Sequence, residues 1–181
     1  MKSLNPAVDA VDYAISILQQ AELIAAAANA SPQVNYGGEV GPHLRHVIEH
    51  VQQLVKGLHL GAVNYDSRER DLSLEQDVAV LRVRITSLIQ SLRALTAADM
   101  QATIEVLLVG RLDGSVQFSA PSTVLRELLF VTSHATHHYA LLANLLRARG
   151  VALPACFGKA PATAQYEAQS QIKQVQLGAI A

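Results

Sequence analysis

The sequence predicts an all-α protein, a four-helix bundle with a small β-hairpin between its third and fourth helices. Four long segments carry apolar residues at the spacing of one helical face. Stretches that contain glycine, proline or runs of polar residues separate these segments. A fifth segment, 103–118, alternates apolar and polar residues, which is typical of two short strands. Four amphipathic helices joined in this way favour a bundle.

The first two helices have start and stop signals. The first is predicted from residue 5 to about residue 30, with Asn5 as its cap and Pro6 at the first helical position. The second begins near Gly41 and ends at Gly61, because glycine is typical of the position after a helix. The polar residues 61–71 then lack any periodicity and are predicted to be a connecting loop.

The third helix is predicted to start after Ser73 and Gln76, which have the spacing of a capping box. It is predicted to end where Asp99 breaks the apolar pattern. The hairpin follows, with Asp113-Gly114 as its turn. The fourth helix is predicted over residues 122–149.

The 181 residues suit one domain with a core of its own. We assign residues 1–160 to the bundle domain. Residues 161–181 form a tail that ends in glutamine- and alanine-rich sequence, which we expect to be a short helix or disordered.

Composition argues against several classes of protein. The net charge is −1, from 14 basic and 15 acidic residues, so nucleic acid is not an expected partner. No apolar run approaches the roughly 18 residues that a membrane-spanning helix needs. Asp9 and Asp12 interrupt the start of the chain, so we expect no secretory signal. The single cysteine, Cys156, fits a reducing, cytoplasmic compartment.

Histidines give the strongest functional signal, because six of the seven fall in two clusters on predicted helices. The second helix carries His43, His46 and His50 on about one face. On the fourth helix, His134 and His138 lie one turn apart, a good bidentate platform for a divalent metal. A third histidine from the second helix would leave coordination positions open, as in catalytic sites. Alternatively, the histidines are solvated or packed and bind no metal.

At these residues the sequence resembles the DinB-like superfamily of four-helix-bundle metalloproteins. The first matching element is Val40-Gly41-Pro42-His43-Leu44-Arg45-His46, and the second is Ser133-His134-Ala135-Thr136-His137-His138-Tyr139. Carried over by position, the resemblance implies His46, His134 and His138 as metal ligands. It also implies an up-down-down-up bundle with a long crossover between the second and third helices.

The resemblance further implies a homodimer and, in members of known activity, thiol-dependent transfer or related metal-dependent reactions. We therefore expect a His₃ site for Zn, Ni or Fe that activates a low-molecular-weight thiol or a water for reaction with a small molecule, as a transferase or a hydrolase. The competing hypothesis is a non-catalytic dimeric binding or stress-response protein.

Several neighbours of the three ligands are candidates for orienting them, since a ligand histidine usually donates its second ring proton to a nearby acceptor. These candidates are His50, His137, Tyr139 and Glu49, and His50 is also an alternative third ligand. We expect His43, at the start of its helix, to be exposed. The charged segment that contains Tyr65, Asp66, Arg68 and Asp71 is expected to be solvated or, alternatively, to bind an anionic substrate.

Overall fold

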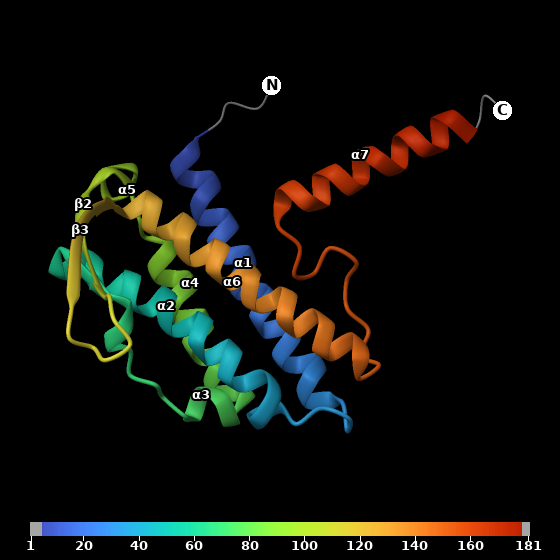
Figure 1. The fold of residues 1–181 in the computed structure, drawn as a ribbon, viewed down its shortest axis with the longest axis horizontal. Helices are drawn as coiled ribbons and strands as arrows, with labels where there is room; N and C mark the ends of the chain where they lie inside the picture. Colours follow the sequence, from blue (N-terminus) through green and yellow to red (C-terminus); the bar gives the residue numbers. More distant parts are fainter. Residues whose placement is uncertain (1–4, 179–181) are drawn as a thin grey trace.

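The computed structural model describes residues 5–178 and is mostly helical, with a small three-stranded sheet (Figure 1). The first four residues of the predicted bundle domain, 1–4, and the last three of the predicted tail, 179–181, lie outside the described residues. The α-helices are α1 (Pro6–Ala30), α2 (Gly41–Leu60), α3 (Ser73–Gln76), α4 (Val78–Arg93), α5 (Ala97–Gln101), α6 (Val124–Ala148) and α7 (Pro161–Gly178). The strands are β1 (Ala62–Asn64), β2 (Thr103–Val109) and β3 (Gln117–Thr123).

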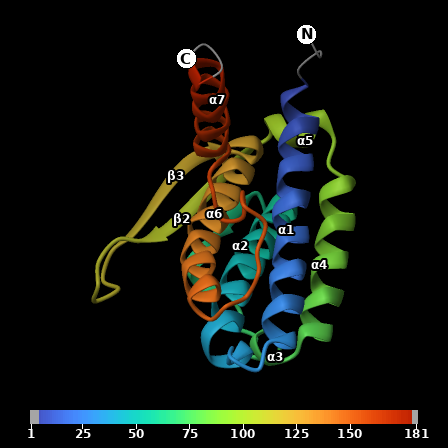
Figure 2. The same cartoon turned by 90° about the vertical axis from the view of Figure 1, so that its right-hand side faces the viewer.

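The long helices α1, α2, α4 and α6 pack against one another (Figure 2). Helix α1 contacts α4 and α6, and α2 also contacts α4 and α6. Helices α2 and α4 run in one direction, opposite to α1 and α6. The chain therefore has to cross the length of the molecule between the end of α2 and the start of α4.

The buried face of α1 is rich in alanine, and this allows close packing of its neighbours. Ala14, Ala21, Ala25 and Ala28 are each at most 1% exposed. Small side chains let helix axes approach, while leucine and isoleucine from the facing helices fill the remaining space. The core thus lies along the contact between all four long helices.

The prediction of a loop over residues 61–71 was wrong near its start, because residues 62–64 form strand β1. This strand pairs in parallel with β2, and β2 pairs antiparallel with β3. A three-residue strand with one buried residue, Val63, is too short to give a periodic signal. Gly57 makes room for it, since a Cβ there would meet the Val63 side chain at 2.3 Å.

The ends of the third long helix also differ from the prediction. Residues 73–76 form the separate helix α3, and the carboxylate of Asp77 caps α4 by accepting from the N–H groups of Ala79 and Val80. Extended backbone at Asp77 separates the two helices. Helix α4 ends at Arg93, before the predicted Asp99, which instead belongs to a capping box at the start of α5.

Strand β3 extends to Thr123, past the predicted end at Phe118, and the Thr123 hydroxyl caps α6. Helix α7 projects from the body of the molecule (Figures 1 and 2). Of the two alternatives for the tail, residues 161–178 are helical. Within the described part of the chain, no helix is both long and apolar enough to cross a membrane.

Candidate metal site

Histidines from α2 and α6 meet where these two helices pack side by side. His46 lies on α2, and His134 and His138 lie one turn apart on α6. One ring nitrogen from each of the three lies within 4.8 Å of the other two. The i, i+4 spacing on α6 explains the pair, and the α2–α6 contact adds the third histidine.

The closest nitrogens belong to opposite helices, because Nε2 of His46 lies 2.8 Å from Nε2 of His134. The ring of His138 lies 4.6 Å from that of His46 and 4.7 Å from that of His134, between ring centres. In tetrahedral zinc coordination, with Zn–N bonds of about 2.0–2.1 Å, two ligand nitrogens lie about 3.3 Å apart. The 2.8 Å between the His46 and His134 nitrogens and the 4.8 Å limit on all three nitrogens lie on either side of this value, so the three imidazoles fit a divalent ion with small adjustments.

Burial favours the neutral form of these histidines, which is the form that binds metal. It lowers the pKa of His46 to about 3, with further lowering by the nearby histidines and Arg68. Burial likewise lowers the pKa of His138 to about 4 and also lowers that of His134. At neutral pH the cluster therefore presents uncharged ring nitrogens.

His50 lies beside the three histidines but has its own partners. Its Nδ1 donates to the carbonyl oxygen of His46 at 2.7 Å, and its Nε2 lies 3.5 Å from Nη1 of Arg68. Its ring stacks on Tyr65, with ring centres 5.5 Å apart. The structure thus brings His50 into the cluster, with one ring nitrogen bonded to the backbone of its own helix.

The expectation that His43 is exposed was wrong. His43 is half-buried, and its Nδ1 lies 2.9 Å from Nδ1 of His138. It lies one turn before His46 on the same face of α2, so it reaches α6 one turn along from the His46–His134 contact.

Two of the predicted orienting residues, His137 and Tyr139, make no hydrogen bond to the three histidines within residues 5–178. His137 is exposed, although its ring lies 5.9 Å from that of His138. Tyr139 is buried and points to α1, where its hydroxyl donates to the carbonyl oxygen of Ile17. Neighbours of a ligand in sequence point elsewhere, because successive helical residues are about 100° apart.

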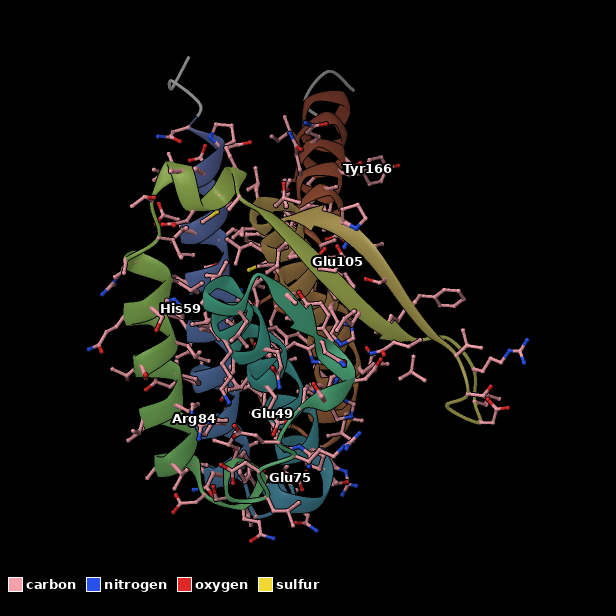
Figure 3. All side chains as sticks on the ribbon, turned by 90° about the vertical axis from the view of Figure 1, so that its left-hand side faces the viewer. Glu49, His59, Glu75, Arg84, Glu105 and Tyr166 are labelled. Carbon is pink, nitrogen blue, oxygen red and sulfur yellow. The ribbon has the colours of Figure 1, made fainter. Side chains whose placement is uncertain are left out.

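Glu49 is buried and contacts the crossover segment, residues 61–72 between α2 and α3, instead of a histidine. It is 2% exposed, and its Oε1 accepts from the backbone N–H of Asp71 at 2.7 Å. Its Oε2 lies 3.8 Å from Nε of Arg68 and 4.0 Å from Nε of Arg45. In Figure 3, Glu49 lies near Glu75 and Arg84, on the side that the crossover covers.

This network places a positive charge beside the histidines. Arg68 is held by Glu49 and by the carbonyl oxygen of Tyr65, to which its Nη1 donates. Its guanidinium then faces His50. Tyr65, Arg68 and Asp71 are consequently docked on residues of α2 and are not solvated, whereas Ser67, Glu69 and Arg70 of the same segment are exposed.

Two residues beside the site, Glu127 and Phe130, were not identified from the sequence. The Tyr65 hydroxyl donates to Oε2 of Glu127 at 2.9 Å, and Glu127 is completely buried. Phe130 stacks on His134 with ring centres 5.9 Å apart. Phe130 precedes His134 by four residues, so helical spacing was a signal that placed it on the same face.

Comparison with known proteins identifies the family of this chain. Residues 19–142 match the sequence model of one protein family, the DinB superfamily. A similar curated protein is FK506-binding protein 5 of Rhizopus delemar, which is 28% identical over 104 residues. That match covers 58% of this chain but only 27% of the fungal protein, about a quarter of its length.

No solved structure matches the chain significantly. The family match nevertheless covers more than half of the sequence and includes α2 and most of α6, which carry the histidines. The chain therefore belongs to the DinB superfamily, a metal-binding family, and three of its histidines could form a metal site.

Proposed function

We propose that this protein binds one divalent metal ion through His46, His134 and His138. The observation that carries the proposal is the mutual approach of three ring nitrogens, all within 4.8 Å, on two packed helices. Imidazole ligands suit Zn, Ni and Fe, among which availability decides. The site would lie in an up-down-down-up bundle domain, residues 1–160, followed by the tail 161–181.

His46 is the better third ligand, and His50 the weaker alternative. Nε2 of His46 already faces Nε2 of His134 at 2.8 Å, whereas His50 has its Nδ1 on a backbone carbonyl and its Nε2 toward Arg68. A nearby guanidinium repels a metal cation at that nitrogen. We expect His46→Ala to lose zinc binding in calorimetric titration and His50→Ala to keep it; the reverse result would make His50 the ligand.

We further propose that the protein is an enzyme, a transferase or a hydrolase acting on a small molecule. A metal held by three neutral imidazoles supplies a Lewis acid that lowers the pKa of a bound thiol or water. The chain's own residues hold the imidazoles neutral, and Arg68 adds a positive charge near the site that favours an anionic reactant such as a thiolate.

Cobalt substitution tests the thiol part of this proposal. A low-molecular-weight thiol such as cysteine or 2-mercaptoethanol, added to the Co²⁺ protein, should produce a sulfur-to-cobalt charge-transfer absorption in the near ultraviolet. His134→Ala protein should give no such band. A Co²⁺ protein whose spectrum is unchanged by thiols would leave water as the only reactant of the two.

A second function, binding without catalysis as a homodimer, is favoured by one observation. Strands β2 and β3 and the turn between them carry exposed apolar side chains at Leu108, Val109, Leu112 and Phe118. Exposed apolar groups of this kind often mark interaction sites. If they form a dimer interface, Phe118→Ser should halve the mass measured by light scattering; a monomeric wild type would contradict the dimer.

We also propose a cytoplasmic location, from the single cysteine. Fractionation of cells tests it.

A further inference from the structure

His43 contacts the proposed metal site through a single partner. Its Nδ1 lies 2.9 Å from Nδ1 of His138, and the two rings meet edge to face, with centres 5.2 Å apart. His43 is not in the group of three whose nitrogens approach one another. Within residues 5–178, it is the only hydrogen bond that joins the ring of a ligand histidine to a side chain outside the ligand set.

The contact determines which nitrogen of His138 is left for a metal. An imidazole has two ring nitrogens, and in the neutral ring one carries a proton while the other accepts or ligates. Since Nδ1 of His138 faces His43, its Nε2 remains for the metal, as in His46 and His134, whose Nε2 atoms face each other. A ring that binds through Nε2 keeps its proton on Nδ1, so His138 would donate and His43 accept.

The backbone around His43 is held in place, which fixes the point from which its side chain reaches α6. His43 is in the first turn of α2, between the buried residues Val40 and Leu44. This turn packs on α3 so closely that a Cβ at Gly41 would lie 2.1 Å from the carbonyl oxygen of Glu75. The Cα of His43 therefore cannot move away from α6 without displacing the start of the helix, and the hydrogen bond to His138 then holds the ring itself.

We propose that His43 is a positioning residue, which accepts the Nδ1–H of His138 and so orients its Nε2 toward the metal. The inference rests on the proposed metal site and adds a residue to it. Partners that hydrogen-bond the second nitrogen of a ligand histidine fix its tautomer and ring orientation, and losing one typically costs 10- to 100-fold in metal affinity. Here the partner is another histidine, where a carboxylate or carbonyl is usual.

Two substitutions separate hydrogen bonding from packing. The amide oxygen of asparagine occupies nearly the position of a histidine Nδ1, so His43→Asn keeps the acceptor, whereas His43→Leu keeps bulk and removes it. We expect His43→Leu to bind zinc 10- to 100-fold more weakly, measured by competition with a chromophoric chelator. His43→Asn should stay within about threefold of the wild type on the same reasoning. Circular dichroism melts identify any variant that fails to fold.

Nitrogen-15 NMR of the zinc-loaded wild type gives a second readout that needs no variant. We expect His138 to be protonated at Nδ1 and bound to zinc through Nε2. Zinc bound at Nδ1 of His138, or to His43 itself, would overturn the inference, as would equal zinc affinity in the wild type and His43→Leu. If the wild type binds no metal, the proposed function falls and the inference with it; if only the His43 variants behave unexpectedly, the inference alone falls.

Discussion

Replacing Glu49 with glutamine removes a buried charge while keeping the shape of the side chain. The amide oxygen of glutamine can still accept from the N–H of Asp71. What is lost is the attraction to two guanidinium groups, because among the described residues Oε2 of Glu49 accepts no hydrogen bond and its ion-pair partners are Arg68 and Arg45. The substitution therefore isolates the electrostatic part of the contact between α2 and the crossover segment.

The distances set the scale of this loss. At 3.8 Å from Arg68, and with an effective dielectric constant of about 20, the Coulomb energy is about 4 kcal/mol. Removing one partner of a buried pair typically costs roughly 3–5 kcal/mol, because the remaining charge is left uncompensated. The glutamine keeps one hydrogen bond, so we expect the free energy of unfolding to fall by about 3 kcal/mol.

Chemical denaturation and thermal melting measure this effect. For a chain of this size, about 3 kcal/mol corresponds to a decrease in Tm of roughly 6–12 °C. The control is Glu69→Gln, the same change in the same segment, where the carboxylate is half exposed and pairs with Lys56. Exposed pairs contribute little, so the control should lose at most about 0.5 kcal/mol. Equal effects of the two substitutions would refute the account of Glu49.

Three further predictions concern the packing and the charge of the site. Gly41→Ala should destabilise the protein by roughly 2 kcal/mol or more in urea denaturation, because its Cβ would collide with the backbone of Glu75, at 2.1 Å from the carbonyl oxygen. Tyr139→Phe should cost about 1 kcal/mol, from loss of one buried hydrogen bond, and leave zinc affinity unchanged; a loss of affinity would return Tyr139 to the site. Burial lowers the pKa of His46 to about 3 and that of His138 to about 4, below the ordinary 6.5. Between the lowered and the ordinary values, the unfolded chain therefore binds more protons than the folded protein. The unfolding free energy of the metal-free protein should thus be fully present above pH 6.5 and fall as the pH is lowered toward 4, whereas a curve flat over this range would contradict neutral histidines in the folded state.

Much of the helical framework could be predicted because its signals are local. The bounds of α1 and α2 follow from Pro6 at the start of one helix and from Gly41 and Gly61 at the ends of the other. Likewise, the i, i+4 pair on α6 follows from helical geometry alone. These features depend on residues close in sequence, and the structure has them where they were expected.

The rest depends on contacts between distant segments, which periodicity does not contain. Strand β1 exists because it pairs with β2, some 43 positions along the chain. The carboxylate of Glu49 is buried because Arg68 and the backbone of Asp71 meet it from the crossover. Position at a helix start suggested that His43 is exposed, but the neighbouring helix α6 covers it.

Metal content tests the central claim most directly. The protein would be prepared without an affinity tag, incubated with Zn²⁺, desalted and analysed by mass spectrometry, with His134→Ala and His137→Ala beside the wild type. His137 is the matched control, because it is an exposed histidine on the same helix, three residues from His134. We expect about one zinc per chain in the wild type and in His137→Ala, and none in His134→Ala. Wild-type protein without metal, or equal loss in both variants, would contradict the claim.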